Sequence, residues 1–187
     1  MSTVVIEVEE SFSLGTFQVQ AFQVTKSDFL GCAFHGDYGT TWLRCMQMCA
    51  GHVKGCRIHG KVSVLPSPFA FQLPHGTSFL AYAKSIGMSN ALIEETVAHT
   101  SVRADTVGRL RQSECAALSL YHAWSEGAEA VVFSTAGLCS AGMLPLYREA
   151  IRRLGDCAAV DVFSPQARGT PVSDHTLRID VTAVGGE

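Results

Sequence analysis

The sequence predicts an α/β protein with a mixed β-sheet covered by helices, and three observations lead to this prediction. Hydrophobic residues make up 47% of the 187 residues and charged residues only 17%, a balance typical of α/β proteins whose strands are buried on both faces. Short apolar runs alternate with longer segments of helical periodicity. No repeat or low-complexity segment interrupts the pattern. We therefore expect a single domain that spans residues 1–187.

The first strands are expected near the N-terminus. Residues 3–9 alternate apolar and acidic side chains, residues 11–15 are typical of a turn, and residues 17–24 alternate again. This pattern predicts a β-hairpin or two adjacent strands. The apolar run over residues 29–34 predicts a short buried strand that ends before a glycine-containing loop.

The middle of the chain changes from strand to helix periodicity. Thr40 or Thr41 is expected to cap a helix that ends near Gly51. Residues 62–65 predict a short strand or an extended link. Apolar side chains then recur at helical spacing over residues 75–86, and the next glycine is expected to end that helix.

The second half of the chain alternates strands and helices. The strands are expected at residues 100–107, 130–135, 158–163 and 177–184, and the helices at residues 109–126 and 144–154. Helices that alternate with apolar strands imply a mixed sheet with helices on its faces.

Charge and cysteine content narrow the class of function. The net charge is −3 and no basic stripe is present, so we expect no nucleic-acid partner. No apolar run reaches membrane-spanning length, and the N-terminal residues are acidic rather than basic, so neither a membrane span nor a signal peptide is expected. Seven irregularly spaced cysteines predict free thiols in the cytoplasm. The low charge also favours an oligomer.

Several motifs occur in an order that resembles a known family. The stretch AFHGDYGTT covers residues 33–41, SPFAFQLPH covers residues 67–75, RADTVG covers residues 103–108, and LPLY begins at Leu144. Over about residues 30–184 the chain resembles the β-ketoacyl synthase-like N-terminal domain proteins of the thiolase-like superfamily. This resemblance implies an α/β fold that corresponds to one half of a thiolase-like protein.

The resemblance also implies roles for individual residues. Gly108 stands where a condensing enzyme has its cysteine, and glycine has no side chain that could attack a thioester. The nearest thiol, Cys115, is expected two turns into the following helix, where a buried and inert thiol is the alternative reading. His35 and His75 are the other catalytic candidates, although His35 could instead hold its loop and His75 could orient its helix.

The function that the resemblance implies is a non-catalytic subunit of the chain-length-factor type. It would pair with an active β-ketoacyl synthase in type II fatty-acid, polyene or polyketide biosynthesis, with acyl carrier protein as a further partner and with no cofactor. The expected partner interface consists of Ser101, Val102, Arg103, Ala104, Asp105, Thr106 and Val107. The candidate walls of an acyl tunnel are Phe69, Phe71 and Phe79, although core packing would explain the same phenylalanines.

Two other functions remain open from the sequence. One is a standalone thiol- or histidine-dependent enzyme that acts on acyl thioesters, with Cys115 or Cys32 near His35. The other is a homodimeric module that binds an acyl group or a small ligand, in which a second copy covers the unpaired edge strand.

One cluster of cysteines and histidines has spacings of four, three, four and three residues. Its members are Cys45, Cys49, His52, Cys56 and His59. A tetrahedral zinc could use four such ligands on one helix face. Gly51 and Gly55 interrupt that helix, however, and structural zinc sites usually use close pairs on opposed turns. We therefore expect no metal here, with Cys45 and Cys49 as core residues.

Overall fold

The computed structural model describes residues 3–15, 17–34, 40–65, 78–99, 112–135, 140–163 and 176–183. The strands in these ranges are β1 (Val4–Val8), β2 (Phe12–Leu14), β3 (Phe17–Val19), β4 (Phe22–Thr25), β5 (Phe29–Phe34), β6 (Arg57–Ile58), β7 (Val62–Val64), β8 (Ala130–Phe133), β9 (Ala158–Phe163) and β10 (Thr176–Ala183). The helices are α1 (Thr40–Cys49), α2 (Phe79–Ser85), α3 (Asn90–His99), α4 (Gln112–Ser125) and α5 (Ser140–Arg152). None of these helices is both long and apolar enough to cross a lipid bilayer.

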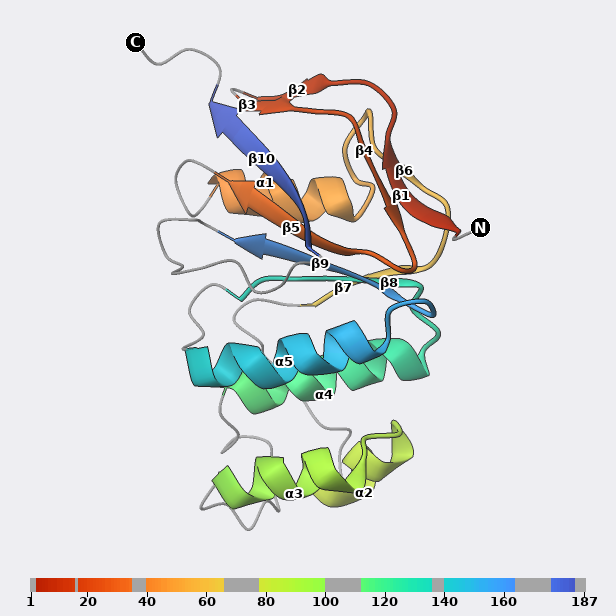
Figure 1. Ribbon diagram of the computed structural model, residues 1–187, viewed down its shortest axis with the longest axis vertical. Coiled ribbons are helices and arrows are strands. Elements are labelled where there is room, and N and C mark those ends of the chain that lie inside the picture. Colours follow the sequence, from red (N-terminus) through yellow and green to blue (C-terminus); the bar gives the residue numbers. More distant parts are fainter. Residues whose placement is uncertain are drawn as a thin grey trace.

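The strands form two sheets (Figure 1). The larger sheet has the order β2-β3-β10-β5-β9-β8-β7, and the smaller one has the order β4-β1-β6. In the larger sheet β10, β5, β9, β8 and β7 are mutually parallel, whereas β2 and β3 form an antiparallel extension beside β10. Strand β10 therefore joins the N-terminal strand pair to the parallel core.

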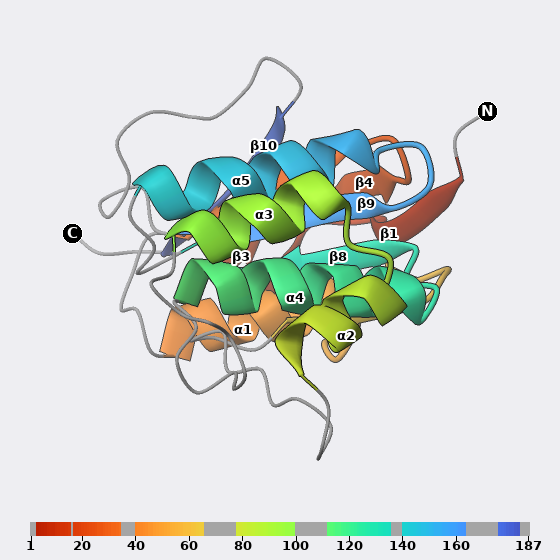
Figure 2. The ribbon, with the colours of Figure 1, turned by 90° about the horizontal axis from the view of Figure 1, so that it is seen from below.

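Helices cover both faces of the parallel strands. Helix α1 lies on one face, where it packs with β5, β8, β9 and the small sheet in one hydrophobic cluster. Helices α4 and α5 lie side by side on the opposite face, and α2 and α3 form a further layer outside them (Figures 1 and 2). Strands β5, β8 and β9 are buried at every position, which explains their nearly continuous apolar sequences.

The sequence of α1 explains its packing. Thr41, Cys45, Met48 and Cys49 are buried at helical spacing, so one stripe of the helix faces the sheet. Gly51 follows with φ +77°, and a Cβ there would lie 2.3 Å from Ile58 Cγ1. Glycine is therefore required at this helix end both for its backbone conformation and for the close approach of Ile58.

The outer layer has its own hydrophobic cluster. Phe79 and Tyr82 of α2 pack with residues of α3 and with Leu118 and Tyr121 of α4. The Tyr82 hydroxyl lies 2.6 Å from Nδ1 of His122 on α4. Side chains of α4 thus contact the sheet on one side and the outer helices on the other.

Most elements confirm the sequence prediction, and the exceptions are instructive. The expected turn over residues 11–15 contains strand β2, and the single alternating run over residues 17–24 is split into β3 and β4, which join different sheets. Strand β6 and helix α3 were not predicted. The strand expected over residues 100–107 lies outside the described residues.

Candidate functional site

Four buried polar side chains gather where β8 ends, beside β9. Ser134 and Thr135 directly follow β8, Asp161 lies within β9, and Tyr147 comes from α5. Ser134 and Asp161 are fully buried. The carboxyl ends of parallel strands are the usual place for ligands in open α/β sheets, so this cluster is the candidate site.

The Asp161 carboxylate accepts most of the hydrogen bonds in the cluster. The Thr135 backbone N–H donates to Asp161 Oδ1 at 3.0 Å, and the Thr135 hydroxyl lies 2.9 Å from Asp161 Oδ2. The Tyr147 hydroxyl donates to the same Oδ2. Ser134 Oγ donates to the carbonyl oxygen of Val162 at 2.7 Å. These bonds connect the end of β8 to β9 and α5.

Burial changes the acidity of Asp161. Its removal from water raises the pKa of the Asp161 carboxyl to about 7, while the hydrogen bonds from Thr135 act in the opposite direction. Near neutral pH the group is therefore close to half protonated. The carboxyl group can therefore hold or release a proton. The groups that donate hydrogen bonds to it belong to Thr135 and Tyr147 of the same chain.

A second buried carboxylate lies on α5. Tyr121 of α4 donates its hydroxyl hydrogen to Glu149 Oε2 at 2.7 Å, and Arg152 Nη1 donates to Oε1 at 2.8 Å. Burial, followed by the interaction with Glu149, raises the pKa of the Tyr121 hydroxyl to about 12. This contact connects α4 to α5 and is structural.

Many residues predicted as functional lie outside the described ranges. They are His35, Phe69, Phe71, His75, Ser101, Val102, Arg103, Ala104, Asp105, Thr106, Val107 and Gly108. Other predicted residues are described. Phe79 is buried against α3 and α4, and Cys115 is buried in the cluster that packs α4 and α5 on the sheet.

The described cysteines are buried free thiols. Hydrogen bonds with Cys45 and Cys49 raise the pKa of the Cys32 thiol well above its ordinary value, and burial adds to this effect. Burial raises the pKa of Cys56 to about 12. Such thiols are poor nucleophiles, so these two lack the reactivity that a thiol enzyme needs.

The cysteine and histidine cluster is divided between core and surface. Cys45 and Cys49 face the core from α1, whereas His52 is exposed and His59 Nε2 lies 2.8 Å from Glu7 Oε2. Within the described residues, no group of three or more His, Cys, Asp or Glu side chains is arranged to hold a metal ion.

Comparisons with known proteins place this arrangement in a fold class. No protein-family model and no curated protein matches the sequence. Among solved structures, an ABC transporter ATP-binding protein from Pyrococcus furiosus has a TM-score of 0.62 and 13% identity, over 95% of this chain and 97% of that one. This chain has the fold of an ABC ATP-binding domain.

Two further solved structures are similar to the chain. A metal-chelate type ABC transporter in an inward-facing conformation has a TM-score of 0.58 and 14% identity over 86% of this chain and 73% of that one. A nucleotide-free ATP-binding cassette from an ABC transporter has a TM-score of 0.53 and 12% identity over 87% and 82%.

These similarities overturn the predicted relation to ketosynthases. The fold is α/β, as expected, but it is not half of a thiolase-like protein. The predicted role as a chain-length factor in fatty-acid or polyketide biosynthesis is wrong, and so is the predicted pairing with a β-ketoacyl synthase. The motifs misled because a glycine-containing loop between a buried strand and a helix occurs in many α/β folds.

ABC ATP-binding domains are expected to hold magnesium and a nucleotide, so the residues of this chain can be tested against that chemistry. A P-loop has the pattern G-x-x-x-x-G-K-[ST], in which the lysine contacts the phosphates. Here Gly36 and Gly39 precede Thr40 and Thr41, but the sequence has no lysine between Lys26 and Lys54. The cation that contacts the phosphates is therefore missing from this loop.

The carboxylate that would hold magnesium is missing as well. In P-loop ATPases an Asp after a core strand holds the ion together with the loop Ser or Thr. Strand β8 is followed by Ser134 and Thr135. Asp161 contacts Tyr147 of α5, on the face of the sheet opposite to α1. The residues present do not fit a magnesium–nucleotide complex.

Sequence reasoning missed the central residue of this cluster. The run over residues 158–163 predicts an apolar strand, yet it contains Asp161, a charged residue type. An acid in the middle of a buried strand needs polar partners. Asp161 is therefore the feature of the sequence that indicates a buried polar cluster.

Proposed function

We propose that this chain is a subunit with the fold of an ABC ATP-binding domain that does not hydrolyse ATP and that acts by binding other proteins. One observation carries the proposal. The end of β8 carries Ser134 and Thr135, whose polar groups are bonded internally to Val162 and Asp161, in place of a carboxylate that could hold magnesium.

The missing lysine supports the same proposal. Phosphoryl transfer depends mainly on positioning and on charge stabilisation by cations. Without a lysine after β5 and without a metal-holding carboxylate after β8, the transition state would lack two of its main charge partners. The lack of either group alone would slow ATP hydrolysis strongly, and the lack of both leaves little charge stabilisation for the transition state.

The proposal extends to the setting of the protein. Several of the similar solved structures come from ABC transporters, so we propose the membrane component of a transporter as the class of partner. We also propose that residues 1–187 form one domain and that the protein works in the cytoplasm, where its buried thiols stay reduced.

An ATPase assay tests the proposal directly. The purified chain is incubated with ATP and Mg²⁺, phosphate release is measured, and binding of ATP is followed by calorimetry. We expect phosphate release at the rate of the protein-free blank and no saturable heat with Mg²⁺–ATP. Turnover above the blank that scales with protein concentration would contradict the proposal.

A variant separates true turnover from contamination. Thr41 is buried at the start of α1, at the P-loop position of the hydroxyl that contacts magnesium. Thr41→Val keeps the shape of the side chain and removes that hydroxyl. Any turnover lost in Thr41→Val belongs to this chain, whereas turnover that persists belongs to a contaminating ATPase.

A further inference from the structure

Six sulfur-containing side chains gather in the hydrophobic cluster between α1 and the sheets. They are Cys32, Cys45, Met46, Met48, Cys49 and Cys56. Four of them have no exposed surface, namely Cys32, Cys45, Met48 and Cys49, and the described cysteines are free thiols. Thiol and thioether sulfur atoms are soft, polarisable donors. The core on this face of the sheet is therefore a dense set of soft donors.

Cys32 lies at the centre of the thiols. It comes from β5 and belongs, with Leu30 and Phe34, to the cluster on the α1 side of the sheet, because alternate residues of a strand point to the same face. Cys45 and Cys49 are one turn apart on α1 and are buried against the sheet. Hydrogen bonds connect the Cys32 thiol to both of them. A strand and a helix thus bring three thiols together.

The number of donors favours a monovalent soft ion. Structural zinc takes four ligands, and the described residues contain no group of three or more His, Cys, Asp or Glu side chains arranged to hold an ion. Cu(I) selects thiolate and thioether ligands and is stable with two of them. One thiolate balances its charge, so the complex brings no net charge into the apolar core.

We propose that the thiols of Cys32, Cys45 and Cys49 form a binding site for one Cu(I) ion. Cys32 is the shared ligand, and either helix thiol completes the pair. The S–H bond of the Cys32 thiol breaks, an S–Cu bond forms, and one proton leaves to solvent. The second thiol binds through a sulfur lone pair and keeps its hydrogen. No oxidant or reductant is needed, and the inference is independent of whether the chain hydrolyses ATP.

Cys56 provides the route by which the ion enters. It is 9% exposed, whereas Cys49 is completely buried. Cys56 lies near enough to Cys49 for the two groups to interact electrostatically. Copper held by one sulfur passes to a neighbouring sulfur by ligand exchange. An incoming ion therefore binds Cys56 first and moves inward through Cys49.

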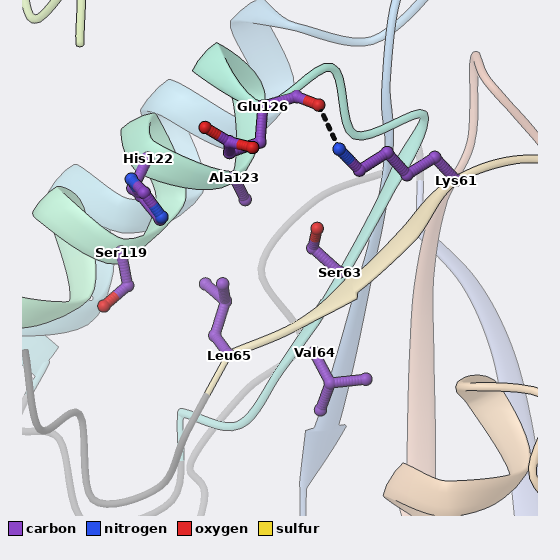
Figure 3. A pocket seen from close by; sticks show the side chains of 8 residues that line it. All are labelled: Lys61, Ser63, Val64, Leu65, Ser119, His122, Ala123 and Glu126. Atoms are coloured by element: carbon purple, nitrogen blue, oxygen red, sulfur yellow. Dashed lines mark hydrogen bonds between the residues drawn. The ribbon is translucent and has the colours of Figure 1, made fainter.

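The pocket between β7 and α4 has different chemistry (Figure 3). Its volume is about 330 Å³, and its described lining residues include no cysteine or methionine. Its polar groups are bonded within the chain. The Lys61 ammonium donates to the backbone carbonyl of Glu126, and Nδ1 of His122 lies 2.6 Å from the Tyr82 hydroxyl. This pocket therefore offers no comparable set of soft donors.

A competition titration tests the proposal. The reduced full chain is titrated under nitrogen with Cu(I) in the presence of bicinchoninate, a chelator whose Cu(I) complex is coloured. We expect the chain to withdraw one equivalent of Cu(I), and native mass spectrometry to show one copper ion per chain. X-ray absorption of the loaded chain should show two sulfur neighbours, and its amide spectrum should remain that of the folded protein.

Serine variants identify the ligands. Cys32→Ser removes the shared ligand and should weaken Cu(I) binding at least about 100-fold. Cys45→Ser and Cys49→Ser should each weaken it by about tenfold or less, because the other helix thiol remains, whereas the double variant should lose binding. The matched control is Cys157→Ser, a buried thiol of the other hydrophobic cluster, which should bind within about twofold of the wild type. Amide spectra of the metal-free variants check the fold.

The opposite results overturn the proposal. Failure of the wild type to withdraw copper, nitrogen or oxygen neighbours in the X-ray absorption spectrum, or equal binding by Cys32→Ser and the wild type would exclude this site. Copper that binds only as the native amide spectrum is lost would show that thiols of the unfolded chain hold the ion. If Cys32→Ser does not fold, X-ray absorption of the loaded wild type decides alone.

Discussion

Asp161 and Glu149 are both buried carboxyl groups on adjacent elements, and their surroundings differ. Asp161 lies among the hydroxyl groups of Thr135 and Tyr147. Glu149 accepts from Tyr121 but also lies beside the guanidinium of Arg152 at the surface. A cation can compensate the charge of Glu149, whereas hydroxyl groups only solvate the charge of Asp161.

The comparison shows that the place of a buried acid, on a helix or on a central strand, decides which groups can compensate its charge. Helix α5 turns Glu149 inward while its neighbours Arg148 and Arg152 reach solvent, so the helix surface supplies the counter-charge. A central strand such as β9 has neighbours on both sides and helices on both faces, so the partners of Asp161 must come from strand ends and helix side chains.

The largest expected effect is that of Asp161→Ala. Loss of the carboxylate leaves the Thr135 N–H and the Tyr147 hydroxyl buried without their acceptor, and it also leaves a small cavity. We expect the free energy of unfolding to fall by about 3–5 kcal/mol, measured by urea denaturation. A loss below about 1 kcal/mol would mean that water or a shifted side chain replaces the carboxylate.

The pH dependence of Asp161 should be the next largest effect. An exposed Asp loses its proton near 3.8, whereas folded Asp161 keeps it to about 7. The folded state therefore binds more protons between these values, so the contribution of Asp161 to stability falls as pH rises through this window and is constant above it.

The neutral variant Asp161→Asn has no ionisable carboxyl at this position, so a comparison with it isolates the pH-dependent contribution of Asp161 to stability. Relative to Asp161→Asn, the wild type should lose about 2 kcal/mol of unfolding free energy between pH 5 and pH 7. Urea denaturation of both proteins at the two pH values measures the difference. A difference that stays constant with pH would mean that the pKa of Asp161 is close to its ordinary value.

Glu149→Ala should have a smaller effect. The Tyr121 hydroxyl loses its acceptor, while Arg152 is exposed and is solvated again by water. We expect a loss of about 1–2 kcal/mol. Glu149→Gln keeps an acceptor for Tyr121 and should cost less. If both variants cost the same, the ion pair rather than the Tyr121 bond dominates.

The smallest expected effects are those of removing the hydroxyl group of Tyr147 or of Tyr121. Tyr147→Phe and Tyr121→Phe should each cost about 1 kcal/mol, so stability alone will not distinguish them. Tyr147→Phe removes a donor to ionised Asp161 and should raise the pKa of that carboxyl further above 7, whereas Tyr121→Phe should leave it unchanged. The ¹³C shift of the Asp161 carboxyl, followed against pH, measures this. An equal pKa in both variants would contradict the hydrogen bond from Tyr147.

Sequence alone predicted the buried strands and the helix ends well. Strands β5 and β8 are continuous apolar runs, β9 is apolar except for Asp161, and Gly51, which ends α1, has a positive φ. These signals are local, so they survive without knowledge of the partner strands. The pairing of strands is not local, and the alternating run over residues 17–24 carried no sign that its two halves join different sheets.

The site was harder to predict than the fold. Motif order pointed to the wrong family because His35, Gly36 and Thr40 fit a loop between a strand and a helix in several folds. The cluster around Asp161 is assembled from β8, β9 and α5, and only the tertiary structure brings Thr135, Tyr147 and Asp161 within hydrogen-bonding distance.

The position of β10 in the sheet affects how the protein folds during its synthesis on the ribosome. It lies between β3 and β5, but it is synthesised roughly 140 residues after β5, which takes on the order of ten seconds or more at cellular rates. During that interval both β3 and β5 lack the neighbour that β10 later provides. Translation speed and chaperones that shield nascent strands should therefore influence the yield of native protein.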